Sequence, residues 1–196
     1  MADFPTRRLL LTKGAVAAGG FLSLDAALAQ APLSPTPECH DGDSATLRQT
    51  EGPFFKPSSP ERADLIESGM PGQQIDLVGF VLTRGCKPVA NAIVDLWHAD
   101  NGGDYDNSGF RLRGHQRADA EGRYRFRTIV PGNYEGRTRH FHVKVAPSGG
   151  RLLTTQLYFP GELANIYDDF YRPEMEMRIV GVPAELGRFD FVLDIA

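Results

Sequence analysis

The sequence is poor in cysteine, and this scarcity limits what its cysteines can do. Only Cys39 and Cys86 occur among its 196 residues. A zinc site built from thiolates needs closely spaced ligands, so two cysteines this far apart do not form one alone. In an oxidising compartment the two could pair as a disulfide, and in a reducing compartment they would remain thiols. The sequence leaves both states open.

The sequence also lacks an excess of positive charge and a cluster of basic residues. Its 21 lysines and arginines are outnumbered by 25 acidic residues, which gives a formal net charge of −4. Proteins that bind nucleic acid usually carry a basic patch, so we expect no nucleic-acid partner. Beyond residue 31, no apolar run is long enough to cross a bilayer.

The first 31 residues have the composition of an export signal. Arg7 and Arg8 precede three leucines, a short glycine-rich apolar stretch follows, and small residues surround Ala29 and Ala31. This order resembles a twin-arginine signal. The sequence therefore predicts export to the periplasm through a twin-arginine signal, with cleavage after Ala29 or Ala31. An uncleaved anchor or a disordered tail is the alternative.

Glycine and proline are plentiful, at 21 and 14 residues, which is typical of an all-β chain with many short strands. Residues 32–60 are rich in Pro, Ser, Thr and Asp and predict an extended N-terminal arm. Residues 61–196 then form one domain with little helix. Its apolar alternation predicts about seven strands, which favours a two-sheet β-sandwich. The expected strands include 75–82, 93–99, 137–145, 153–159 and 189–195. Residues 118–129 are expected as a turn that leads into a strand, and 161–171 as a segment with a short helix.

This strand pattern alone does not separate an enzyme from a binding module. Metal-free sandwiches of the transthyretin-like and carboxypeptidase-regulatory types have similar sequence patterns in their strands and turns. The stretch "RTRHFHVKV" at 137–145 adds chemistry, because successive side chains of a strand point to opposite faces. Phe141 would face the core, while His140 and His142 would share the other face. Such a pair can bind one metal ion, and it can equally be two surface histidines.

Two tyrosines beside glycines extend this pattern. Tyr105 lies in "NGGDYDN", and Tyr134 lies in "VPGNY", six residues before His140. Together with "QTEGPFF", "VDLWHADNGGDYDN" and "TTQLYFPGEL", these motifs resemble the intradiol ring-cleavage dioxygenases, most closely the protocatechuate 3,4-dioxygenase β chain. The resemblance implies a non-haem Fe(III) ion bound by Tyr105, Tyr134, His140 and His142. It also implies a second role for Tyr134, as the tyrosinate that leaves iron and takes a substrate proton.

These residue types suit a ferric ion. A bound cation can hold a phenol as phenolate at neutral pH, although free phenol titrates near 10. Two phenolates and one hydroxide balance three positive charges, and two neutral imidazoles add none. The resemblance further places Arg137 and Gln156 beside the substrate, where Arg137 would stabilise negative charge on the ring.

The resemblance thus implies an enzyme that cleaves a catechol-type ring between its two hydroxyls with O₂, giving a cis,cis-muconate-type diacid. The alternative is a metal-free binding module or the iron-free partner chain of a dioxygenase. A partner chain would be expected to lack some of the four ligands, and none is missing. Extradiol enzymes instead use ferrous iron with two histidines and a carboxylate.

Several other residues are expected to have structural roles. His98 and His115 are expected as pocket wall or surface groups, Trp97 as a packing residue, and Glu51 as a partner for a loop near the site. Glu135 and Gly136 replace the tryptophan-containing stretch that we associate with protocatechuate enzymes. The ring substituent of the substrate and the oligomeric state, including a possible homo-oligomer, stay open.

Overall fold

The structure is a computed structural model that describes residue 39, residues 44–181 and residues 183–195. The predicted export signal at 1–31 and the first part of the arm lie outside these residues. Within the described part of the chain, no helix is long and apolar enough to cross a membrane.

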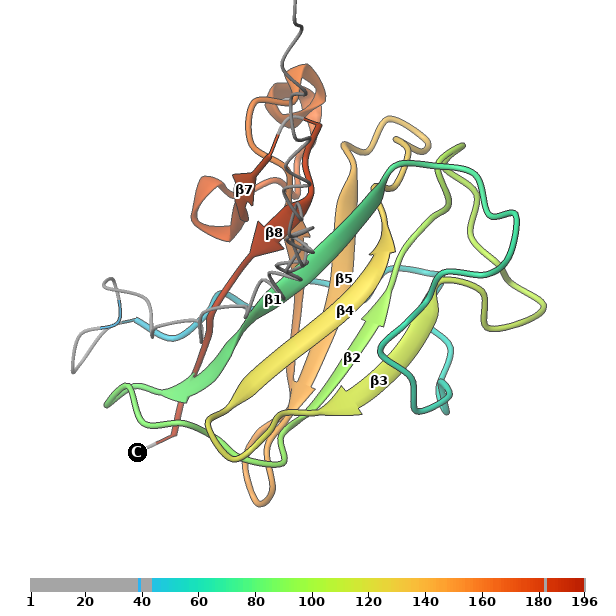
Figure 1. Ribbon diagram of the computed structural model, residues 1–196. Coiled ribbons are helices and arrows are strands. Elements are labelled where there is room, and N and C mark those ends of the chain that lie inside the picture. The colour runs from blue at the N-terminus through green and yellow to red at the C-terminus, as the bar shows by residue number, and fades with distance from the viewer. Residues whose placement is uncertain (1–38, 40–43, 182, 196) are drawn as a thin grey trace, which may run out of the picture. The chain divides into compact units, whose positions relative to one another are not determined.

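Two β-sheets pack face to face and form the sandwich that the sequence predicts (Figure 1). In the first sheet the strand order is β4-β1-β8-β7, and β9 pairs with β1. Its strands are β1 (Gln74–Thr83), β4 (Arg123–Ile129), β7 (Arg178–Val180), β8 (Leu186–Arg188) and β9 (Phe191–Leu193). In the second sheet the order is β3-β2-β5-β6. Its strands are β2 (Ile93–Trp97), β3 (Arg113–Arg117), β5 (His140–Ala146) and β6 (Leu153–Tyr158).

The observed strands agree with the predicted all-β fold and add three short ones. β3, β7 and β8 were not predicted, because β3 reads "RGHQR" and the other two have three residues each. Strands this short or this polar show no period-2 alternation. The short helix expected within 161–171 is a 3-10 helix, η1 (Leu163–Tyr167), and a second, η2 (Pro173–Met175), follows it.

The core lies between the two sheets and is built by the alternation of side chains along the strands. On β5 the inward residues are Phe141, Val143 and Val145, and all three are fully buried. Leu77 of β1 and Phe126 of β4 face them from the other sheet and are equally buried. Burying side chains of this size contributes about 1.5–3 kcal/mol each.

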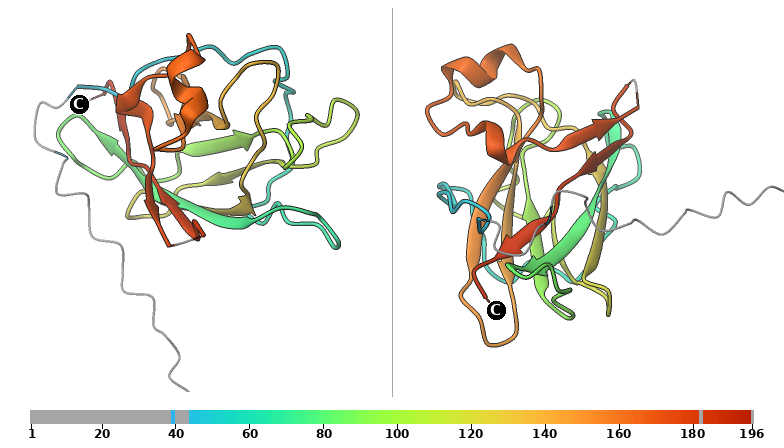
Figure 2. Two further views of the ribbon diagram at one scale, coloured as in Figure 1. Left: turned by 90° about the horizontal axis from the view of Figure 1, so that it is seen from above. Right: turned by 90° about the vertical axis from the view of Figure 1, so that its left-hand side faces the viewer.

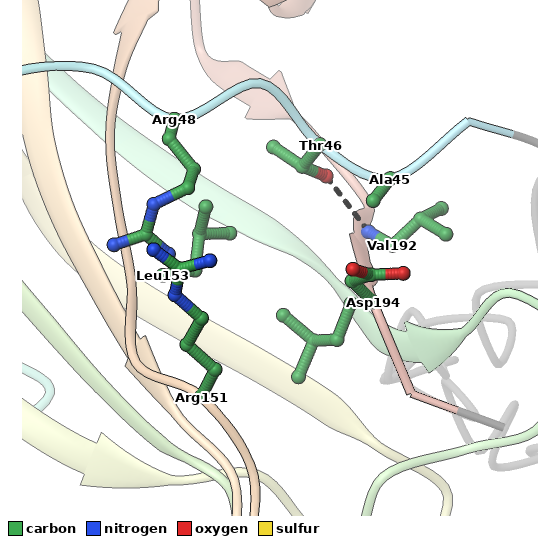
Figure 3. A pocket seen from close by; sticks show the side chains of 8 residues that line it. Ala45, Thr46, Arg48, Arg151, Leu153, Val192 and Asp194 are labelled. Carbon is green, nitrogen blue, oxygen red and sulfur yellow. Dashed lines mark hydrogen bonds between the residues drawn. The ribbon is translucent and has the colours of Figure 1, made fainter.

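The arm runs along the second sheet as extended chain held by backbone hydrogen bonds. The amide of Gln49 donates to the Thr154 carbonyl on β6, and the amide of His115 on β3 donates to the Pro60 carbonyl. At its start, Thr46 Oγ1 accepts a hydrogen bond of 2.8 Å from the amide of Val192 on β9 (Figure 3). A disulfide joins Cys39 to Cys86 and resolves the choice that the sequence left open.

The segment between β6 and β7 forms the coils at one end of the sandwich (Figure 2). Two of its polar side chains point inward to the chain just before β5. Asn165 accepts a hydrogen bond of 2.7 Å from the Thr138 hydroxyl, and Asp168 accepts one of 3.0 Å from the Thr138 amide. The arm and this segment therefore cover the outer face of the second sheet.

Candidate metal centre

His140 and His142 lie on the outer face of β5, as the alternation predicts. Both are nevertheless buried, at 2% and 1% exposure, because the arm and the 161–177 segment cover this face. In the sheet register His142 lies between Trp97 of β2 and Gln156 of β6. The Trp97 ring stacks on the His142 ring at 4.9 Å and nearly parallel, so the imidazole is fixed from one side.

The two histidines present their Nε2 atoms to each other at 3.1 Å. Nδ1 of His140 lies 2.6 Å from the Thr138 carbonyl oxygen, which can only accept. The neutral ring therefore carries its proton on Nδ1 and has a free lone pair on Nε2. Burial lowers the pKa of His140 to about 4 and lowers the pKa of His142 well below its usual range, which favours the neutral form of both rings.

The loops that carry the two tyrosines cross at a pair of glycines. A Cβ on Gly103 would lie 2.2 Å from the Asn133 carbonyl oxygen, and a Cβ on Gly132 would lie 2.7 Å from that of Asn101. Only residues without a side chain permit this approach, and Gly103 also has a φ of +94°. The glycines of "NGGDY" and "VPGNY" thereby bring Tyr105 and Tyr134 together.

Four aromatic rings close a cycle at this point. The ring centroids lie 5.2 Å apart for Tyr105 and Tyr134, and 5.7 Å apart for Tyr134 and His140. They lie 4.7 Å apart for His140 and His142, and 6.1 Å apart for His142 and Tyr105. The structure therefore gathers the four side chains that the sequence nominated as metal ligands, from two loops and one strand.

Two polar atoms of this cluster are buried without a hydrogen-bond partner among the described residues. They are the Tyr105 hydroxyl and Nδ1 of His142. Burial, with the neighbouring Tyr134, raises the pKa of Tyr105 well above its usual range. Burial also raises the pKa of Tyr134, against the charge of Arg137 and a hydrogen bond from it. An unpartnered buried hydroxyl is costly, by about 1–3 kcal/mol.

This donor set fits a ferric ion. Two nitrogens bound to one metal at about 2.1 Å and at right angles are about 3.0 Å apart, close to the observed Nε2 separation. The Thr138 carbonyl fixes the His140 tautomer in the way that partners of metal-binding histidines do. A cation would also supply the partner that the Tyr105 hydroxyl lacks. No group of three His, Cys, Asp or Glu side chains with metal-binding spacing occurs within the described ranges.

The arm forms one wall of the cluster. Phe54 stacks on Tyr105 at 4.5 Å, and Phe55 contacts Trp97 at 5.0 Å. Gly52 has a φ of +70°, and a Cβ there would lie 3.2 Å from Cε1 of His142. Glycine therefore lets the arm lie directly against the imidazole.

Arg137 lies beside the cluster in a polar network. Its Nε donates to both carboxylate oxygens of Asp168, at 2.9 and 2.8 Å. Its Nη2 donates to Oε1 of Gln156 at 2.6 Å. The Gln156 side chain is fully buried, and its Nε2 donates to the Thr50 carbonyl at 3.0 Å. The two residues predicted to lie beside a substrate are thus in contact with each other.

A pocket of about 420 Å³ opens beside the two tyrosines. Its lining residues are Phe54, Gly102, Gly103, Asp104, Tyr105, Asn107, Asn133, Tyr134 and Glu135. The histidines, Arg137 and Gln156 are not part of this lining. A smaller pocket of about 120 Å³ lies between the arm and β9, and its lining includes Thr46, Arg48, Arg151, Val192 and Asp194 (Figure 3).

The other nominated residues have structural contacts. His98 is buried on the inner face, with Nδ1 at 2.7 Å from the Ala99 carbonyl and Nε2 at 2.6 Å from the Thr128 hydroxyl. Nδ1 of His115 lies 3.1 Å from the Ser59 hydroxyl. Glu51 pairs with Lys144 at 2.6 Å and fastens the arm to β5. Both nitrogens of His98 have partners, whereas Nδ1 of His142 has none among the described residues.

Comparison with known proteins identifies the class to which this fold and cluster belong. A family model described as dioxygenase matches residues 50–193. Catechol 1,2-dioxygenase 2 of Acinetobacter lwoffii is 36% identical over 154 residues, covering 65% of this chain and 56% of that protein. The protocatechuate 3,4-dioxygenase beta chain of Burkholderia cepacia is 36% identical over 126 residues, covering 55% and 54%.

A solved structure extends the likeness to the fold. The dioxygenase domain of a dioxygenase carbohydrate-binding protein fusion from Streptomyces sp. SirexAA-E is 49% identical, with a TM-score of 0.75. The match covers 78% of this chain and all of that one. The chain belongs to the intradiol ring-cleavage dioxygenase family. It spans about half the length of the curated relatives that it matches.

Sequence reasoning missed part of the cluster's surroundings. The motif "QTEGPFF" contributed only to the family resemblance, and no role was predicted for Gly52 or Phe54. Two adjacent aromatic residues in an otherwise polar arm indicate that the arm packs against the domain. Asp168 was also missed, because one aspartate in "IYDDFY" has no local signal that distinguishes it from a surface residue.

Proposed function

We propose that this protein is a non-haem Fe(III) dioxygenase that cleaves a catechol-type ring between its two hydroxyls with O₂. The product would be a cis,cis-muconate-type diacid. The observation that carries the proposal is the closed cycle of two phenols and two imidazoles, with two buried polar atoms that lack partners in the described part of the chain. Family membership supports the same chemistry.

Tyr105, Tyr134, His140 and His142 would hold the iron. When bound, iron would act as a Lewis acid that orients the catechol and accepts electron density from it. The protein's own task is to hold its donors in place. Trp97 stacks on His142, Phe54 stacks on Tyr105, and the Thr138 carbonyl fixes the tautomer of His140.

Tyr134 is suited to a second role as proton acceptor. Both tyrosines are part-buried and border the pocket, but Phe54 stacks on the Tyr105 ring and lies edge-on to the Tyr134 ring. Burial raises the pKa of Tyr134, and the positive charge of the nearby Arg137 guanidinium opposes this and favours the phenolate. A phenolate at this position can take a proton from an incoming catechol hydroxyl. The same guanidinium can stabilise negative charge on the bound ring.

The test is an oxygen-uptake assay of iron-loaded protein with catechol, protocatechuate, hydroxyquinol and alkylcatechols. We expect one O₂ consumed per ring, a diacid product cleaved between the hydroxyls, and a red-brown colour from tyrosinate-to-iron charge transfer. Tyr105→Phe should lower both the colour and the uptake. A colourless iron-loaded protein that consumes no O₂ with any of these catechols would contradict the proposal and favour a metal-free binding module.

We also propose that the protein is exported to the periplasm. Arg7 and Arg8 head the N-terminal segment, and the Cys39–Cys86 disulfide suits an oxidising compartment. Replacing both arginines by lysine should retain the protein in the cytoplasm when the fractions are compared by immunoblot. Unchanged export of that variant would contradict the twin-arginine assignment.

A further inference from the structure

Asp168 is a buried carboxylate in the turn that follows η1. Its side chain has 0% exposure, and that of its partner Arg137 has 13%. A carboxylate this deeply buried is stable only if charged and polar partners replace its water. The partners of the Asp168 carboxylate therefore indicate the role of this residue.

Three groups donate to this carboxylate. Nε of Arg137 reaches both oxygens, the Thr138 amide lies 3.0 Å from Oδ2, and the Phe170 amide lies 2.9 Å from Oδ1. The two amides belong to different segments, the chain before β5 and the 161–177 segment. Asp168 is thus fixed by backbone on two sides, and a fixed carboxylate fixes the arginine that it binds.

The guanidinium is held in one place as a result. Asp168 takes Nε, Gln156 takes Nη2 at 2.6 Å, and the Phe170 ring lies 4.6 Å from the guanidinium carbon. Other arginine–aspartate pairs of the protein are more exposed. Arg125 pairs with Asp76 on the surface, where the two side chains are 51% and 27% exposed. An exposed pair of that kind contributes about 0–1 kcal/mol and restrains little.

We propose that Asp168 is a positioning residue that holds the Arg137 guanidinium against Gln156 and beside Tyr134. The inference rests on the proposed function, in which Arg137 acts on Tyr134 and on the bound ring. A side chain as long as arginine has many rotamers, and a displacement of about 1 Å from productive geometry can cost about 100-fold in rate. Asp168 removes that freedom before substrate arrives.

Asp168→Asn keeps the shape of the side chain and removes its charge. We expect kcat per bound iron to fall about 10- to 100-fold, with a smaller change in KM. Iron content and the charge-transfer colour should be retained, because Asp168 is not among the proposed ligands. In a crystal structure of the variant, Nη2 of Arg137 should no longer lie within hydrogen-bond distance of Gln156.

A double-mutant cycle separates positioning from general stability. If Asp168 acts only through Arg137, the double variant D168N/R137M should have a kcat within about twofold of R137M alone. Independent roles would instead multiply the two losses. If D168N fails to fold, Asp168→Glu keeps the charge and displaces it by one methylene, and the same cycle applies.

Asp190→Asn is the matched control. Asp190 is also a buried carboxylate in an arginine pair, 3.4 Å from Arg188, and it accepts from the Phe80 amide on the first sheet. The Asp190→Asn substitution should lower the melting temperature and leave kcat per bound iron unchanged. Equal kcat per iron in wild type and D168N, or an Arg137 unmoved in the crystal, would overturn the inference. A wild-type protein without activity on any catechol would instead contradict the proposed function.

Discussion

The two faces of the β3-β2-β5-β6 sheet are both buried, but by different means. The inner face packs against another sheet and is mostly apolar, as Leu96 and Phe141 show. The outer face is covered by the irregular arm and the 161–177 segment, and it carries His142, Trp97 and Gln156 side by side. On the inner face the buried polar side chain of His98 has partners for both ring nitrogens within the fold, whereas Nδ1 of His142 on the outer face has none among the described residues.

This difference gives a physical reason for the proposed ligands to lie on the outer face. A second sheet offers few free donors and acceptors, because its backbone groups bond within the sheet. An irregular segment has unpaired carbonyls and amides to offer, such as the Thr50 carbonyl that accepts from Gln156. The proposed metal ligands therefore lie where irregular segments cover the sheet. The apolar side chains that stabilise the fold lie where the two sheets pack on each other.

His142→Ala on the outer face should have the largest effect on activity. It removes one of the four proposed ligands, so we expect iron, colour and oxygen uptake to fall to background. The free energy of unfolding of the iron-free protein should change little beyond the lost Trp97 contact, because Nδ1 of His142 makes no hydrogen bond in the described structure. Iron analysis and urea unfolding measure the two quantities. Retained iron with normal uptake would show that His142 is not a ligand.

Phe141→Ala, one residue away on the inner face, should have the opposite effect. Phe141 is fully buried, so its truncation should lower the free energy of unfolding by about 3–5 kcal/mol. We expect kcat per bound iron of the protein that folds to be unchanged at low temperature. Phe141→Leu is the milder companion and should cost less. A large loss of kcat per iron in Phe141→Leu would mean that the two faces are not independent.

The inner face has one buried histidine that sharpens the comparison by pH. Burial lowers the pKa of His98 to about 4, whereas an unfolded histidine titrates near 6.5. Between these values the unfolded chain binds the extra proton. The stabilisation is thus complete above pH 6.5 and is lost as the pH falls toward 4, by at most about 3 kcal/mol.

Urea unfolding of iron-free protein between pH 7 and pH 4.5 measures this loss. His98→Gln should have a flatter dependence on pH over that window, although it is less stable at pH 7. An identical slope in the two proteins would show that His98 does not carry the acid sensitivity.

Gly52→Ala tests how closely the arm must approach the outer face. The φ of +70° disfavours alanine by about 1–2 kcal/mol, and the new Cβ would lie 3.2 Å from the His142 ring. We expect both lower stability and a several-fold lower kcat per iron. Gly149→Ala is the control, because its φ is +78° and no atom lies within 4 Å of the added carbon. If both variants lose the same activity, backbone strain alone explains the effect.

The sequence determined the sandwich and the residues of the cluster. Period-2 alternation marks Phe141, Val143 and Val145 as core because a strand has only two faces, and it leaves His140 and His142 on the other face. The glycines beside Tyr105 and Tyr134 indicated tight loops for the same local reason. Both signals depend on neighbours within a few residues, so they can be read along the chain.

Only the tertiary structure decided what covers that second face. Burial of the histidines depends on residues about 90 positions earlier, such as Gly52 and Phe54, and the position of Arg137 depends on Asp168, 31 residues later. No local pattern encodes such contacts, because they form only when the arm and the 161–177 segment close over the sheet. Local alternation thus determines which side chains share one face of a strand. Long-range packing determines whether that face is exposed to solvent or buried.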